Sequence, residues 1–173
     1  MPINLLAAIP DRNITLDAKS KNLFLFFLIA FSVVAFSQAI GYWVNSTIAE
    51  GSTIEINGLI HFTHIRNHGG VFGMLQGMSS LFALISIGLL AAVVAYLWLS
   101  SSIKRYEYIC FAFVVGGGAS NILDRFIYGS VIDFLDIQHI PYWNYVFNTA
   151  DVMIHVGIWP LLLLSFFFEP KTE

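Results

Sequence analysis

Long stretches without a charged side chain leave few folds open to this chain. No Asp, Glu, Lys or Arg occurs between Arg66 and Lys104, and an apolar run covers residues 23–44. A run of about 20 apolar residues is long enough to cross the ~30 Å hydrocarbon core of a bilayer as a helix. Only 11% of the residues are charged, whereas a soluble domain has about a quarter. The sequence therefore predicts an integral membrane protein.

Four apolar segments can be placed along the chain, at residues 23–44, 79–99, 106–126 and 148–168. Two outer loops, residues 45–78 and 127–147, separate them. In the first loop, residues 53–57 and 60–65 have a β-like pattern, and Asn57-Gly58 between these runs is a hairpin signal. We expect an all-α membrane protein with a small extramembrane β-sheet or hairpin on the outer membrane face. Residues 1–173 would form one four-span domain.

The positive charges indicate how the spans are oriented. Four spans place both termini on one side of the membrane, and six of the eight Lys and Arg residues fall on that side. Positive residues are retained in the cytoplasm, so both termini are predicted to be cytoplasmic. The two remaining residues, Arg66 and Arg125, would face outside with the outer loops.

Three aspartates and an arginine fall at the ends of the third and fourth spans: Asp124, Arg125, Asp133 and Asp151. An ionised side chain at mid-bilayer costs roughly 2.5–3.5 kcal/mol, which makes these residues functional candidates. Asp133 and Asp151 should lie at one depth, near the outer membrane surface. Two carboxylates in a poorly solvated place share a proton, so one can activate water while its protonated partner donates to a carbonyl or leaving amine. This pattern predicts a membrane aspartic protease.

Structural roles also fit the same acids. Asn148 followed by Asp151 three residues later resembles a capping box at the start of the fourth helix. Asp124 and Arg125 fit an interfacial anchor or a structural ion pair.

Other residues give weaker signals. His61, His64 and His68 suggest a metal site, but their spacing and the absence of supporting cysteines favour solvated loop histidines. Cys110 is the only cysteine, inside an apolar run, and fits a packing role. We therefore expect no metal, no other cofactor and no nucleic-acid partner.

Four short motifs occur in order along the chain. They are Arg66-Asn67-x-Gly69-x-x-Phe72-Gly73, Asn121-x-x-Asp124-Arg125, Gly129-x-Val131-x-Asp133-Phe134 and Phe147-Asn148-x-Ala150-Asp151. With these motifs at this spacing, the chain resembles bacterial signal peptidase II, the lipoprotein signal peptidase, over essentially its whole length.

The resemblance implies a role for each matching residue. It places the catalytic dyad on Asp133 and Asp151, and assigns contact with the substrate backbone or the peptide antibiotic globomycin to Asn67. The other substrate-binding or supporting positions that it implies are Gly69, Phe72, Asn121, Asp124, Arg125, Asn148 and Ala150.

The resemblance also implies partners and a location. The substrate would be a prolipoprotein whose cysteine carries a diacylglyceryl group, cut just before that cysteine. Membrane lipid and a globomycin-type inhibitor would be further partners, and the chain is expected to act as a monomer. The active site would lie near the outer leaflet of the bacterial cytoplasmic (inner) membrane.

Two stretches of the chain depart from the family's pattern. Ser37 stands where the family has an Asp before Gln38, the Lys that usually follows is absent, and Ser120 replaces a Gly. A non-catalytic paralogue that binds lipoproteins or lipopeptides is therefore a second hypothesis. A proton-linked transporter using Asp124 and Asp151 is disfavoured, because no acid lies midway in the first two spans.

Overall fold

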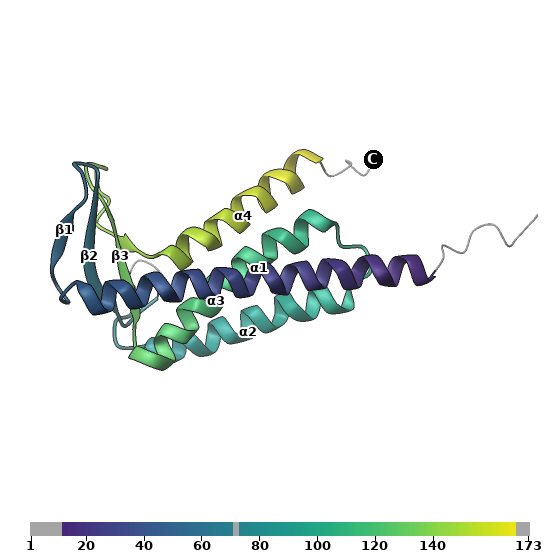
Figure 1. Cartoon of the computed structure of the whole chain (residues 1–173), viewed down its shortest axis with the longest axis horizontal. Helices are drawn as coiled ribbons and strands as arrows, with labels where there is room; N and C mark the ends of the chain where they lie inside the picture. Colours follow the sequence, from purple (N-terminus) through teal and green to yellow (C-terminus); the bar gives the residue numbers. More distant parts are fainter. Residues whose placement is uncertain (1–11, 71–72, 169–173) are drawn as a thin grey trace, which may run out of the picture.

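The computed structural model describes residues 12–70 and 73–168, which form four long helices and a small sheet (Figure 1). The helices are α1 (Arg12–Thr47), α2 (Ser79–Leu99), α3 (Arg105–Tyr128) and α4 (Thr149–Phe168). The strands are β1 (Thr53–Glu55), β2 (Ile60–Asn67), β3 (Val131–Ile137) and β4 (Val146–Phe147). In the described part of the chain all four helices are long and apolar enough to cross a membrane. The predicted four apolar helices and small sheet are thus confirmed.

The sheet lies at one end of the helical bundle (Figure 1). The start of α1 and the end of α4 lie at the opposite end, together with the connection between α2 and α3. Every segment that joins a helix to a strand is therefore at the sheet end of the molecule.

Helix α1 is longer than the span predicted for it, since it begins at Arg12 rather than near residue 23. At 1.5 Å per residue its 36 residues extend about 54 Å, well beyond a ~30 Å hydrocarbon core. Its polar first part is held in place: Lys21 pairs with Asp17 at 2.6 Å, and Lys19 Nζ donates to the carbonyls of Trp98 and Ser100 at 2.6 and 2.9 Å. The Lys19 ammonium thus satisfies carbonyl groups at the end of α2.

Helix α3 packs against the other three helices through consecutive glycines. A Cβ added to Gly116 would lie 2.7 Å from Val33 Cβ on α1, and one added to Gly118 would lie 3.0 Å from Leu90 Cδ2 on α2. At Gly117 it would collide with the Ala150 carbonyl on α4. Each glycine therefore faces a different helix.

The sheet is antiparallel, in the order β1-β2-β3-β4. The predicted hairpin is present as β1 and β2, with Thr53 opposite Thr63 and Glu55 opposite His61. Strands β3 and β4 lie in the segment expected only as an outer loop. The first four residues of β3 are all buried, so no polar-apolar alternation marks the strand in the sequence.

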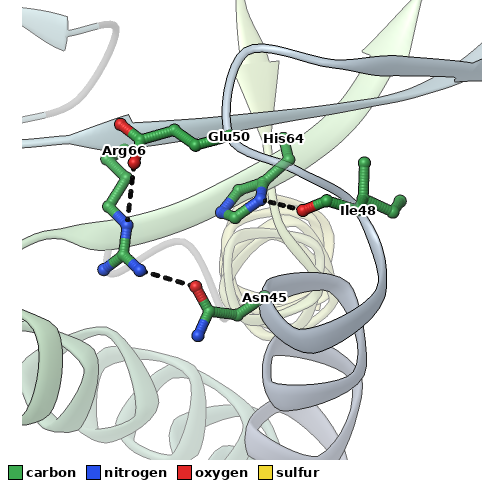
Figure 2. A network of polar contacts seen from close by, with 5 residues as sticks. All are labelled: Asn45, Ile48, Glu50, His64 and Arg66. Carbon is green, nitrogen blue, oxygen red and sulfur yellow. Dashed lines mark hydrogen bonds and ion pairs between the residues drawn. The ribbon is translucent and has the colours of Figure 1, made fainter.

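A set of polar contacts fixes β2 against the end of α1 (Figure 2). Arg66 on β2 donates to Asn45 Oδ1 at 2.6 Å and lies 3.6 Å from the Glu50 carboxylate. His64 is 2% exposed, and its Nδ1 lies 2.7 Å from the Ile48 carbonyl. The expectation of solvated loop histidines is wrong for His64, because this ring is buried where the sheet meets the helix.

We predict that Gly117→Ala lowers the free energy of unfolding by about 1–3 kcal/mol, because the added methyl group overpacks the contact between α3 and α4. Thermal unfolding in detergent, followed by tryptophan fluorescence, would measure the loss. Gly88→Ala is the matched control: nothing lies within 4 Å of its added Cβ, and alanine favours a helix. Equal stability of the two variants would contradict the packing argument.

Candidate active site

A cavity of about 650 Å³ lies between the sheet and the ends of α3 and α4 next to it. Asp133 of β3 and Asp151 of α4 both line it. Its other lining residues are mostly apolar or aromatic, including Ile137, Ile140, Trp143, Val152 and Trp159. The structure therefore brings the two predicted aspartates to one largely apolar cavity.

Asp133 is positioned by β3 and by two side-chain amides. It is 2% exposed and pairs with Ile65 of β2. Its Oδ1 accepts a hydrogen bond from Asn148 Nδ2 at 2.7 Å, and its Oδ2 accepts one from Asn67 Nδ2 at 3.0 Å. Both carboxylate oxygens thus have a neutral donor.

Asp151 is positioned by the first turn of α4. Its Oδ1 accepts from Asn121 Nδ2 at 2.8 Å, and its Oδ2 accepts from the Asn148 backbone N–H at 3.2 Å. In return, the Asp151 N–H donates to Asn148 Oδ1 at 3.0 Å. This reciprocal pair is a capping box, so Asp151 caps the helix and lines the cavity at the same time.

Asn148 connects the two aspartates. Its Nδ2 donates to Asp133 and also to Asn121 Oδ1 at 3.2 Å, while its backbone N–H reaches Asp151. The residue is 4% exposed, and both amide hydrogens and the amide oxygen are used. A single buried asparagine therefore fixes both carboxylates and the start of α4.

Burial, and after it the neighbouring Asp151 carboxylate, raise the pKa of Asp133 from its ordinary value of 3.8 to about 7. The hydrogen bonds from Asn148 and Asn67 act against this rise, because they favour the ionised form. A carboxyl group with this pKa can hold or release a proton near neutral pH, as acid-base chemistry requires.

Asp124 and Arg125 do not form the ion pair that one reading of the sequence suggested. Asp124 is 6% exposed and accepts from Gln38 Nε2 at 2.7 Å and from the Ile132 N–H at 3.2 Å. The Ile132 contact holds the backbone directly before Asp133. Asp124 thus supports the site through the backbone of β3.

Arg125 lies at the cavity and bridges α3 to the loop after β2. Its guanidinium donates to the Asn121 carbonyl at 3.0 Å and to the Gly69 carbonyl at 2.9 Å. It is also within electrostatic range of Asp133 and Asp151. Arg125 therefore brings a positive charge to the cavity without bonding directly to either acid in the described part of the chain.

The remaining predicted positions are placed differently. Asn67 lines the cavity, and its Oδ1 accepts at 2.9 Å from the N–H of Gly69, the residue before the lining glycine Gly70. Ala150 is 2% exposed and packs against Gly117, so its role here is close helix contact. Phe72 lies outside the described residues.

Two polar residues of the site were missed. Gln38 holds Asp124, and His155 lines the cavity one turn after Asp151. Each is a polar side chain inside an apolar span, the same signal that singled out the aspartates. The aromatic wall formed by Trp143, Tyr145 and Trp159 had no comparable signal, since such residues are also common at membrane interfaces.

The polar side chains around Asp133 and Asp151 fit carboxylate chemistry. Within residues 12–70 and 73–168, no three His, Cys, Asp or Glu side chains gather as a metal site. The dyad oxygens are instead met by amide donors, as an acid-base pair requires.

Comparisons with known proteins agree with this geometry. A family model described as signal peptidase (SPase) II matches residues 29–168. The lipoprotein signal peptidase of Nostoc punctiforme is 34% identical over 149 residues, which cover 86% of this chain and 93% of the relative. That of Clostridioides difficile is 33% identical over 151 residues, covering 86% and 99%.

Solved structures show the same likeness. A bacterial membrane enzyme superposes with a TM-score of 0.75 at 28% identity, covering 86% of this chain and 93% of the other. A second structure of a bacterial membrane enzyme gives 0.73 at 27% identity.

We predict that Asp133→Asn changes how stability depends on pH. Because the folded-state pKa is raised, the ionised carboxylate destabilises the fold above pH 7, and this cost disappears as the pH falls towards 3.8. The stability of the variant relative to the wild type should therefore increase by about 1–3 kcal/mol from acid to pH 8. Chemical unfolding of both proteins in detergent at several pH values would measure this change. If the stability of the two proteins depended on pH in the same way, the raised pKa of Asp133 would be contradicted.

Proposed function

This chain belongs to the signal peptidase II family of aspartic proteases, and from that premise we propose that Asp133 and Asp151 are its catalytic pair. It is a membrane peptidase that removes the signal peptide from prolipoproteins. The observation that carries the assignment is the shared donor: Asn148 contacts both carboxylates at one cavity, 2.7 Å from Asp133 and 3.2 Å from Asp151.

The pair can hydrolyse a peptide bond when it holds one proton. The ionised carboxylate takes a proton from water as the water oxygen bonds to the scissile carbonyl carbon. The protonated partner donates its proton to the carbonyl oxygen, which gives a gem-diol. When the gem-diol collapses, one of its hydroxyl protons returns to that partner, and the other carboxyl group gives the amine the proton that it took from water as the C–N bond breaks. One proton remains on the pair at the end, so the dyad is regenerated without a covalent intermediate.

The cavity walls suit a substrate that arrives within the membrane. Ile137, Ile140, Val152 and Trp159 give an apolar surface beside the dyad, and Val152 and Trp159 belong to a helix that can span the bilayer. Such walls would accept the apolar end of a signal peptide and an acyl-bearing cysteine. We therefore assign cleavage to the bond just before a diacylglyceryl-modified cysteine.

Asn67, Gly69, Asn121, Asp124, Arg125 and Asn148 support the pair in this proposal. A globomycin-type inhibitor would occupy the same cavity next to Asn67. One chain supplies both aspartates and all their described donors, which supports action as a monomer.

The orientation proposed is that of a multi-pass protein of the bacterial inner membrane with both termini in the cytoplasm. The distribution of Lys and Arg supports it. The sheet and the dyad would then lie near the outer leaflet, where a lipid-anchored substrate can diffuse in sideways.

A purely binding role is less well supported. Binding a lipidated peptide needs an apolar surface, and it does not require two acids held around one buried amide. The similar proteins named above are also called peptidases.

We predict that Asp133→Asn and Asp151→Asn each lower the cleavage rate by about 10²–10⁴-fold, because either change removes one member of the acid-base pair. A gel-shift assay with a diacylglyceryl-modified prolipoprotein would measure the rate. Asp136→Asn is the matched control: this aspartate lies on the same strand but accepts from Thr63 Oγ1 at 2.8 Å and does not line the cavity. Normal cleavage by a folded dyad variant would refute the assignment.

Two single cysteines would test the orientation. Gly58→Cys lies in the hairpin between β1 and β2, and Ser102→Cys in the connection between α2 and α3, both exposed. A membrane-impermeant maleimide should label position 58 in spheroplasts, and position 102 only after permeabilisation. Cys110 is buried, which limits background labelling. The reverse pattern would place the dyad at the inner leaflet.

A further inference from the structure

His155 is an ionisable residue in an otherwise apolar part of α4. It lies one turn after Asp151, is exposed and lines the same cavity as the dyad. A titratable side chain in a membrane span is costly, which makes it a functional candidate. Its position at the cavity fits contact with a substrate rather than packing within the protein.

The contacts of the ring fix its orientation. His155 Nδ1 lies 2.8 Å from the Asp151 carbonyl oxygen, which can only accept a hydrogen bond, so Nδ1 carries the hydrogen. The ring of Trp159 lies one turn further, 6.4 Å between centroids and tilted by 34°. In the neutral imidazole Nε2 is then an acceptor, and no described residue donates to it.

The substrate supplies a matching donor. A peptide must be extended around the bond that is cut, and its backbone N–H groups then lose their helical partners. An unpaired N–H in an apolar, membrane-level cavity is costly. The carboxylate oxygens of Asp133 and Asp151 already accept hydrogen bonds from asparagines or the backbone. The Nε2 atom of His155 is an uncommitted acceptor in the same cavity.

We propose that His155 is a substrate-binding residue, whose Nε2 accepts a hydrogen bond from a backbone N–H of the substrate segment that is extended next to the cleavage site. This inference rests on the proposed peptidase function. It adds to the dyad a residue that binds the peptide part of the substrate without taking part in proton transfer.

Protonation separates this role from a structural one. The imidazolium keeps the Nδ1 hydrogen bond to Asp151 but can no longer accept at Nε2. A purely structural histidine would therefore act alike in both forms, whereas a substrate-binding one weakens in acid. The other charged or titratable groups at the cavity are Asp133, Asp151, Arg125 and Tyr145. We expect titration of the dyad to appear in kcat.

The test measures kcat and KM for the full-length protein in detergent, with a synthetic diacylglyceryl lipopeptide. His155→Leu should raise KM about fivefold, the loss expected for one hydrogen bond, with kcat little changed. His155→Gln restores an acceptor and should recover most of the affinity. On acidification, KM of the wild type should rise while that of the Leu variant stays level, because an imidazolium cannot accept at Nε2.

Substrates with one amide replaced by an ester identify the donor. The ester that removes the relevant N–H should raise KM for the wild type and leave KM of His155→Leu unchanged. A double variant, His155→Leu with Val156→His, keeps the number of histidines but moves the histidine to a residue that does not line the cavity, and it should not recover affinity.

The outcomes distinguish the proposed peptidase function from the proposed role of His155. An inactive wild type, or an active Asp133→Asn variant, would overturn the peptidase assignment itself. Normal dyad behaviour with an unchanged KM in His155→Leu would overturn only the role of His155, as would a loss confined to kcat.

Discussion

The hydrogen bonds of Asn148 are the contacts on which this site depends. Two acids held near hydrocarbon need donors, and the choice of donor decides their chemistry. A lysine or arginine bonded directly to Asp133 would hold it ionised, whereas the neutral amides of Asn148 and Asn67 satisfy its oxygens and leave its pKa at about 7. Arg125 is instead bonded to the carbonyls of Asn121 and Gly69, so its charge reaches the cavity from a distance.

The fold supplies the rigidity that this arrangement needs. Consecutive glycines let α1, α4 and α2 pack closely around α3, which carries Asn121 and Arg125. The sheet is fixed to α1 by Arg66 and His64, and β2 in turn pairs with β3 next to Asp133. The dyad is thus held from both sides, by a helix start and by a strand whose position depends on the bundle.

The sequence was most informative at positions where a polar or charged side chain would be costly in a membrane. The apolar runs predicted four helices, and the rare charges near the ends of these runs predicted Asp133 and Asp151. The same argument, applied to uncharged and weakly basic side chains, would have found Gln38 and His155. It could not find β3, because a strand buried on both faces has no alternation, nor the burial of His64, which depends on how the hairpin meets α1. The way in which segments distant in the sequence pack together cannot be inferred from local sequence patterns.

The two departures from the family's pattern lie together in space. Ser37 and Ser120 both line a void of about 10 Å³, close to the size of one water molecule. Gln38 Nε2 donates to Asp124 at 2.7 Å and to the backbone carbonyl and the hydroxyl oxygen of Ser120, both at 3.1 Å, so the serine that replaces glycine gives the glutamine a third acceptor. None of the described donors to Asp133 or Asp151 comes from α1. The first helix reaches the dyad through Gln38, Asp124 and the Ile132 N–H, and that path does not pass through position 37. The loss of an acid there therefore leaves the described hydrogen bonds of Asp133 and Asp151 intact.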